Sequence, residues 1–404
     1  MPAIDPDRLL GDLYKLRTFG TYKTGVHRPS LSQADVAARQ WLAGRMSEAG
    51  LDVQIDGIGN LFGKRPGAGQ RVLAGSHLES QNQAGWLDGA LGVIFALEAS
   101  RAMQDESGGG VDVIAFFDEE GHFGSYLGSR SFIGDVTEPE IDRARDRTHG
   151  KPLREALAEA GYAGRPRLTI DPKRYAGFFE AHIEQGNSLE SANLKIGVVT
   201  AIVGLWDYRI KVTGEQNHAG TTTMEQRKDA GLTLVRLIAA IDRAFRDVAG
   251  AASVWTCGRI EFEPGAPSVI PGEARALLQF RDPDPNVLER MEQALHQQVD
   301  AANSDGPCSI ALEVIRQSKP AWMSEDLQRA IEDASAVHAP KLAIRMPSGA
   351  GHDAQHVARV LSAAMLFVPS IGGISHHWAE NTSDADIVLG ARVFTDAIAG
   401  VLRG

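Results

Sequence analysis

The sequence predicts an α/β protein with a second, α+β domain inserted into its chain. Residues 71–76 and 111–117 are mostly apolar runs typical of buried strands, and a helical period over residues 91–99 lies between them. From residue 206 the pattern changes to strands that alternate apolar and polar side chains, in the order β-α-β-β-α-β. That order is the ferredoxin-like arrangement. A length of 404 residues also favours two domains over one core.

The first domain begins with an amphipathic helix over residues 32–49, which Ser32 is expected to cap and Gly50 to end. A β-α-β unit follows, for which we expect a right-handed parallel connection. Residues 135–176 show no clear period. The other expected elements are strands at 51–55, 61–64 and 178–183 and, after the insertion, a helix at 325–336, a strand at 363–369 and a helix from about residue 386.

The inserted domain is predicted from its alternating strands and its two long amphipathic helices. Its expected elements are strands at 206–213, 253–262, 274–281 and 309–315 and helices at 228–248 and 286–299. We therefore expect a first domain made of residues 1–205 and 317–404, with residues 206–316 as the insertion. Together these elements predict a mixed sheet with helices on its faces and a separate, smaller sheet.

Composition and charge exclude several classes of function. The net charge of −11 argues against a nucleic-acid surface. No apolar stretch approaches the ~20 residues of a membrane span, and the N-terminus lacks the segments of a signal peptide. Cys257 and Cys308 are the only cysteines, too few for a disulfide framework or a thiolate metal cage. We expect a cytoplasmic protein that binds neither nucleic acid nor membrane.

Histidines and carboxylates follow the predicted buried strands. Because parallel strands bring their carboxyl ends to one edge of a sheet, we expect these side chains to converge. Any one histidine alone is more often a core or surface residue, but four of the five candidates lie in Gly- or Ser-rich junctions at strand ends. Imidazole and carboxylate ligands suit two divalent ions, with zinc, manganese, cobalt and nickel all open. The candidate ligands are His77, Asp88, Glu120, His182 and His376.

Three further side chains have chemistry that would complement such a centre. Glu119 precedes a candidate ligand and is the best candidate for a general base, with a solvated loop residue as the alternative. His218, among small residues of the inserted domain, could donate to a developing oxyanion; a turn histidine is the alternative. Arg281 could bind a substrate carboxylate through two hydrogen bonds, although an arginine considered alone is more often in a surface ion pair.

Taken in order, these segments resemble the metal-dependent amidohydrolases of the hydantoinase/carbamoylase type. That group includes N-carbamoyl-L-amino-acid hydrolase, β-ureidopropionase and allantoate amidohydrolase, within the wider aminoacylase and dinuclear zinc exopeptidase family. The resemblance covers nearly the whole chain, and its most specific feature is that the His-Ile-Glu-Gln-Gly motif occurs together with the Gly-Ala-Gly-His-Asp-Ala motif. The motifs are Gly75-Ser76-His77, Asp88-Gly89, Glu119-Glu120-Gly121, His182-Ile183-Glu184-Gln185-Gly186, Asn217-His218-Ala219-Gly220, Gly349-Ala350-Gly351-His352-Asp353-Ala354 and Gly372-Gly373-Ile374-Ser375-His376.

The resemblance implies a role for each matching position. One metal would be held by His77 and His182, the other by Glu120 and His376, with Asp88 bridging both. Glu119 would be the base. The inserted domain would be a lid and dimerisation domain of a homodimer, closing over the site. The residues that would bind substrate are Gln185, His218, Ser268, Arg281 and Gly373.

The sequence departs from the family pattern at several of these positions. Glu79 stands where the family usually has an Asp that orients a histidine ligand. Gly265 and Ser268 stand where asparagines are expected. Trp86 and Trp378 flank the motifs and could reshape the pocket, with surface packing as the alternative. These departures leave the side chain of the substrate open.

The predicted function is hydrolysis of the linear C–N bond of an N-carbamoyl-L-amino acid or related ureido acid. The nearest alternative is an N-acyl-amino-acid hydrolase or a dipeptidase on the same scaffold. A binding or regulatory protein with a decayed metal site is the alternative from another class. The complete set of five candidate ligands together with Glu119 argues against that last reading.

Overall fold

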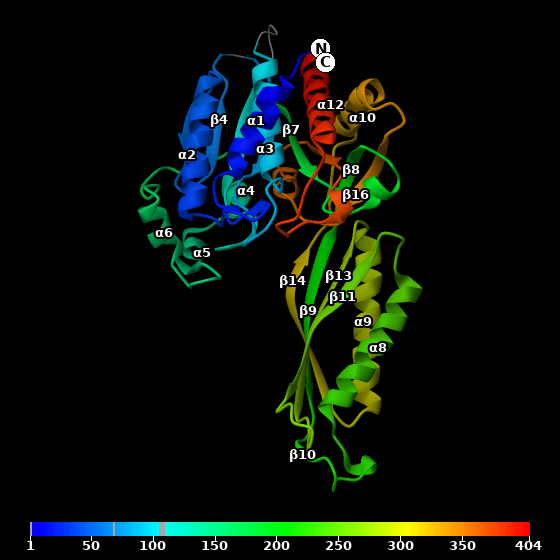
Figure 1. The fold of residues 1–404 in the computed structure, drawn as a ribbon. Coiled ribbons are helices and arrows are strands. Elements are labelled where there is room, and N and C mark those ends of the chain that lie inside the picture. The colour runs from blue at the N-terminus through cyan, green and yellow to red at the C-terminus, as the bar shows by residue number, and fades with distance from the viewer. Residues whose placement is uncertain (1, 68, 105–109) are drawn as a thin grey trace. The chain divides into compact units, whose positions relative to one another are not determined.

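The computed structural model describes residues 2–67, 69–104 and 110–404, and the chain divides into two compact units (Figure 1). The first unit contains the residues up to Thr200 together with Trp322–Gly404, and the second is Ala201–Ala321. Among the described residues, no helix is both long enough and apolar enough to cross a membrane.

The first unit is built on a mixed sheet of nine strands. Its four central strands are parallel and lie in the order β17 (Ala363–Val368), β7 (Tyr175–Ile183), β5 (Arg71–His77) and β6 (Val111–Phe116). Every residue of β17, β5 and β6 is buried, which explains why these strands are mostly apolar. The outer strands are β4 (Leu61–Lys64) and β3 (Asp52–Ile55) beyond β6, and β8 (Ile196–Ile202), β15 (Ala321–Trp322) and β16 (Ala343–Ser348) beyond β17. The predicted mixed α/β architecture is confirmed.

Helices enclose this sheet and bury its apolar side chains. Helix α3 (Ala90–Ala102) joins β5 to β6 and packs against both strands, as expected for a β-α-β unit. In α2 (Gln33–Glu48) the Ser32 hydroxyl accepts the backbone N–H of Asp35, and Gly50 follows the helix with a φ of +74°. The remaining helices of this unit are α1 (Pro6–Arg17), α4 (Leu127–Phe132), α5 (Glu138–Arg143), α6 (Leu153–Glu159), η1 (Pro172–Arg174), α7 (Ser188–Ser191), α10 (Glu325–His338), α11 (Ala354–Val357), η3 (Ile371–Gly373) and α12 (Asp384–Arg403); a short hairpin, β1 (Thr21–Tyr22) and β2 (Gly25–Val26), completes it.

The second unit has its own antiparallel sheet and core. Its strand order is β11-β13-β9-β14, and helices α8 and α9 pack against the sheet (Figure 1). The buried Tyr208, Phe245 and Phe280 lie at the centre of its core. This is the β-α-β-β-α-β topology that the alternating strands predicted. The elements are β9 (Gly204–Thr213), β10 (Asn217–His218), η2 (Met224–Gln226), α8 (Ala230–Val248), β11 (Val254–Glu263), β12 (Val269–Ile270), β13 (Glu273–Asp282), α9 (Pro285–Asp305) and β14 (Ser309–Ser318).

Candidate metal centre

Two groups of possible metal ligands meet at the C-terminal edge of the parallel strands. One group is His77, Asp88 and His182, and the other is Asp88, Glu120 and His376. Within each group the candidate ligand atoms lie within 4.8 Å of one another. The structure therefore brings together all five side chains that the sequence indicated, and Asp88 belongs to both groups.

Each ligand arrives on a different element of the sheet edge. His77 is the last residue of β5, and His182 is the last but one of β7. Glu120 follows β6, and His376 follows β17. Asp88 lies in the connection from β5 to α3, where Glu380 accepts its backbone N–H. The fold thus gathers residues that are far apart in the sequence.

The carboxylate of Asp88 divides its two oxygens between the two groups. Its Oδ1 lies 3.0 Å from Nε2 of His182 and 3.4 Å from Nε2 of His77. Its Oδ2 lies 3.3 Å from Nε2 of His376. A carboxylate placed in this way can serve two neighbouring ions, one through each oxygen.

The second ring nitrogen of two histidines defines their tautomer. Nδ1 of His77 lies 3.1 Å from the carbonyl oxygen of Glu79, and Nδ1 of His182 lies 2.9 Å from that of Ile183. A carbonyl oxygen only accepts, so each Nδ1 carries a proton, and when the ring is neutral its lone pair is at Nε2. The backbone N–H of Gly89, 3.2 Å from Nε2 of His182, agrees with this assignment.

The environment of these atoms favours a cation. Histidine lone pairs face carboxylate oxygens of Asp88, an arrangement that is stable only with a proton or a metal ion between them. The hydrogen bond to Asp88 raises the pKa of His376 to about 9, a second sign that positive charge is favoured there. In addition, Oε1 of Glu120 is buried without a hydrogen-bond partner among the described residues. The donor set therefore fits divalent metal ions.

Glu119 lies beside these groups without belonging to either. Its side chain is 9% exposed, and its Oε2 lies 3.9 Å from Nε2 of His77. Burial and the neighbouring charge of Glu120 raise the pKa of Glu119 well above its usual range, although His77 opposes the shift. A carboxylate whose pKa is raised by burial is a stronger proton acceptor than an exposed one, which suits the predicted general base.

Several polar side chains hold the ligands in place. Gln185, predicted to bind substrate, donates through Nε2 to Oδ2 of Asp88 (3.1 Å) and to the hydroxyl of Ser375 (3.0 Å). Nε2 of Gln81 donates to Oε2 of Glu120 at 2.6 Å. Gln81 was not among the predicted site residues, because its role depends on contacts rather than on a motif or a period.

Trp86 and Trp378 both pack against the N-terminal segment. Trp86 is 2% exposed and stacks on Tyr14 at 5.4 Å between ring centroids. The ammonium of Lys23 lies 4.2 Å from the ring centroid of Trp378. Gly373, another predicted substrate contact, has a φ of +65° and lies so close to Asn187 that a Cβ would be 2.9 Å from the Asn187 Cβ.

The remaining predicted substrate contacts belong to the second unit, at opposite ends of its sheet. His218 pairs with Val269 across β10 and β12, and the N–H of Ala219 donates to the carbonyl of Ser268 at 2.9 Å. Arg281 lies opposite Leu205, at the start of β9, whereas His218 follows the end of that strand (Figure 1). The intervening strand, Leu205 to Thr213, is roughly 26 Å long at ~3.3 Å per residue. The structure thus brings His218 and Ser268 together and separates both from Arg281.

The sheet and the two ligand groups that share Asp88 define the class, a candidate metal-dependent enzyme of the α/β type. The sequence model of peptidase family M20/M25/M40 matches residues 70–400. The chain belongs to this family, which confirms the resemblance drawn from the motifs.

Similar proteins narrow the relationship within that family. A solved amidase of the hydantoinase/carbamoylase family from Burkholderia phymatum is 47% identical, with a TM-score of 0.94 and coverage of 100% of this chain and 99% of that chain. The N-carbamoyl-L-amino acid amidohydrolase of Geobacillus stearothermophilus is 32% identical over 99% of this chain and 100% of its own. The allantoate amidohydrolase of Bacillus subtilis is 32% identical over 87% of each chain.

Proposed function

We propose that this protein is a metal-dependent amidohydrolase that cleaves a linear C–N bond in an N-carbamoyl-L-amino acid or a related ureido acid. The observation that carries the proposal is the pair of ligand groups sharing Asp88, with Glu119 beside them. Relatives that are 32% identical over most of the chain act on N-carbamoyl-L-amino acids and on allantoate, as their names state. The substrate is accordingly a small ureido compound rather than a peptide bond in a protein.

In the proposed reaction, five residues bind the metal ions and Glu119 transfers the proton. His77 and His182 would hold one ion, Glu120 and His376 the other, and Asp88 both, with zinc, manganese, cobalt or nickel as candidates. When bound, such ions polarise a carbonyl group and lower the pKa of a water molecule. Glu119 accepts the proton of the attacking water and returns it to the leaving nitrogen. A carbamoyl substrate then yields the free amino acid, carbon dioxide and ammonia.

Side chains of the second unit would recognise the substrate. Arg281 would bind the α-carboxylate, with Ser268 standing where the family has an asparagine that assists this arginine, and His218 would donate to the developing oxyanion. Gln185 and Gly373 of the first unit would contact the reacting end. The family resemblance supports these roles, and the free thiols of Cys257 and Cys308 agree with a cytoplasmic enzyme.

Ammonia release tests the proposed reaction. The apo protein is loaded with zinc, manganese, cobalt or nickel and assayed on N-carbamoyl, ureido and N-acyl amino acids and dipeptides. We expect metal-dependent ammonia from a carbamoyl or ureido compound. Free amine from an acyl compound or dipeptide, without ammonia, would instead establish the alternative aminoacylase or dipeptidase activity. No product from any compound, with metal bound, would overturn the proposal.

We further propose that the protein is a homodimer formed through the second unit. Exposed apolar side chains gather on the edge strand β11 and the neighbouring α8: Leu232 (41% exposed), Val235 (49%), Ile260 (45%) and Phe262 (41%). Such a surface beside an unpaired strand edge is typical of an interface. His218 and Arg281 of one subunit are too far apart to contact one small ureido acid. In a dimer, one site can instead take Arg281 from one subunit and His218 from its partner.

Mixing two inactive variants tests this arrangement. His218→Ala and Arg281→Ala should each be almost inactive, because every site lacks one substrate contact. After the two are unfolded and refolded together, we expect about a quarter of wild-type activity, since half the dimers carry one site with both residues intact. Each variant refolded alone is the control. If the mixture stays inactive while forming dimers, the two residues act from the same subunit.

A further inference from the structure

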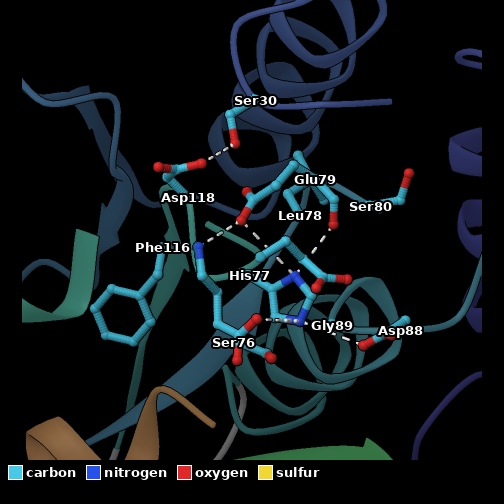
Figure 2. A network of polar contacts seen from close by, with 12 residues as sticks. Ser30, Ser76, His77, Leu78, Glu79, Ser80, Asp88, Gly89, Phe116 and Asp118 are labelled. Atoms are coloured by element: carbon cyan, nitrogen blue, oxygen red, sulfur yellow. Dashed lines mark hydrogen bonds and ion pairs between the residues drawn. The ribbon is translucent and has the colours of Figure 1, made fainter. Parts of the chain in front are cut away.

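The side chain of Glu79 lies close to His77 and Asp118, at the edge of the candidate metal centre (Figure 2). Its carboxylate connects the backbone of Glu119 to the guanidinium of Arg39. Its Oε1 accepts the backbone N–H of Glu119 at 2.7 Å, and its Oε2 accepts Nη2 of Arg39 at 2.7 Å. The side chains of Glu79 and Arg39 are both fully buried. A buried carboxylate with two such strong hydrogen bonds has little freedom to move.

Arg39 fixes the same region from helix α2. Its Nε donates to Asp35 on the preceding helical turn, and its Nη2 donates to Phe116 at the end of β6 as well as to Glu79. The carbonyls of Gly59 and Ala115 accept from Nη1. Every N–H group of the guanidinium therefore has an acceptor. One side chain ties α2 to the strand end from which Glu119 and Glu120 emerge.

The turn after β6 requires this support. Asp118 has a φ of +56°, a left-handed conformation that non-glycine residues rarely adopt. Its carboxylate accepts the hydroxyl of Ser30, visible in Figure 2, and the backbone N–H groups of His122, Phe123 and Gly124. Asp118 thus anchors the far side of the turn, and Glu79 anchors the side that carries Glu119.

Glu79 does not take the role that the family pattern assigns to an Asp at this position. The Nδ1 proton of His77 is donated to the backbone carbonyl of Glu79, whereas the Oε1 of Glu79 is 3.9 Å from that nitrogen. The histidine is therefore oriented by the main chain. The longer side chain reaches past it to the backbone N–H of Glu119 and to the guanidinium of Arg39.

We propose that Glu79, backed by Arg39, is a positioning residue for the general base: its carboxylate holds the backbone of Glu119 rather than the imidazole of His77. This inference rests on the proposed function of Glu119. It adds that the buried ion pair of Glu79 and Arg39 fixes the position of Glu119. A side chain shortened by one methylene, about 1.5 Å, cannot reach both Arg39 and the Glu119 amide. A displacement of this order in a reacting group can lower a rate about 100-fold.

Glu79→Asp tests the proposal, with Glu98→Asp as its matched control. Glu98 is also fully buried, and it also accepts a backbone N–H, that of Asp5 at 2.7 Å, and an arginine, Arg8 at 2.7 Å. For Glu79→Asp we expect kcat for ammonia release to fall about 10- to 100-fold with KM and bound metal unchanged. Hydrogen exchange at the Glu119 amide should also become at least about tenfold faster. Glu98→Asp should change neither quantity, even if it lowers thermal stability equally.

The outcomes separate this inference from its alternatives. Unchanged kcat and unchanged exchange in Glu79→Asp would overturn it. Loss of metal in proportion to loss of kcat would also overturn it, because that result would assign Glu79 to the orientation of His77. If the wild-type protein releases no ammonia, the proposed function fails, and exchange at Glu119 alone decides the role of Glu79. Arg39→Lys, which keeps the charge but lacks the planar fork, replaces Glu79→Asp if that variant does not fold.

Discussion

Glu119→Gln is expected to retain the bound metal of the wild-type protein and to lose ammonia release by about 10³-fold or more. Glutamine has the same length as glutamate, and the contact of this residue with Glu79 is made by its backbone N–H. The turn should therefore survive the substitution. The side-chain amide cannot accept a proton from the attacking water, so the chemical step fails while binding persists. Metal content after dialysis and steady-state kinetics measure the two effects separately.

Glu120→Gln is the informative comparison, because it makes the same change one residue along the chain. Glu120 shares a group of ligand atoms with Asp88 and His376, and its carboxylate faces His376 at 3.7 Å. This variant should lose metal as well as activity. Near-wild-type turnover in Glu119→Gln would remove Glu119 from the mechanism. Loss of metal in that variant would place it among the ligands instead.

His77, His182 and Glu120 could be predicted from the sequence because each lies at or just after the end of a buried strand, whereas Asp88 and His376 were indicated by the Gly-rich junctions around them. The runs ending at His77 and before Glu119 are mostly apolar and are buried at every position, as expected of strands covered on both faces. Parallel neighbours then bring their ends to the same edge. The distance from His77 to His182 along the chain is irrelevant once β5 and β7 pair directly.

Other features depend on contacts that no local pattern records. Strand β8, Ile196–Ile202, was not among the predicted strands, and its place beside β17 is decided by pairing rather than by period. Helix α9 extends to Asp305, six residues beyond the predicted end at 299, although its last turns contain few apolar side chains. The buried Arg39 lies within an amphipathic helix pattern, where an arginine ordinarily indicates the solvent face. The distance between His218 and Arg281 becomes evident only from the register of the paired strands, which the sequence does not show.

Asp88→Ala is expected to abolish binding of both metal ions. In contrast, His182→Ala and His376→Ala should each abolish binding of only one ion. The two oxygens of Asp88 face different groups, Oδ1 toward His77 and His182 and Oδ2 toward His376. His182→Ala should therefore keep the ion held by Glu120 and His376, and His376→Ala should keep the other. We expect one bound ion per chain in each histidine variant and close to none in Asp88→Ala, with ammonia release reduced by at least about 10³-fold.

Elemental analysis after equilibrium dialysis against each candidate metal measures these occupancies. Asp88→Asn is the control for shape, because it keeps the size of the side chain and the backbone N–H that Glu380 accepts, while it removes the negative charge and replaces one oxygen by an NH2 group that cannot bind a metal ion. It should bind metal nearly as poorly as Asp88→Ala, since a neutral amide between three histidines cannot offset two divalent charges. If Asp88→Ala retained one full equivalent, Asp88 would serve a single ion, and the two groups of ligands would be independent sites.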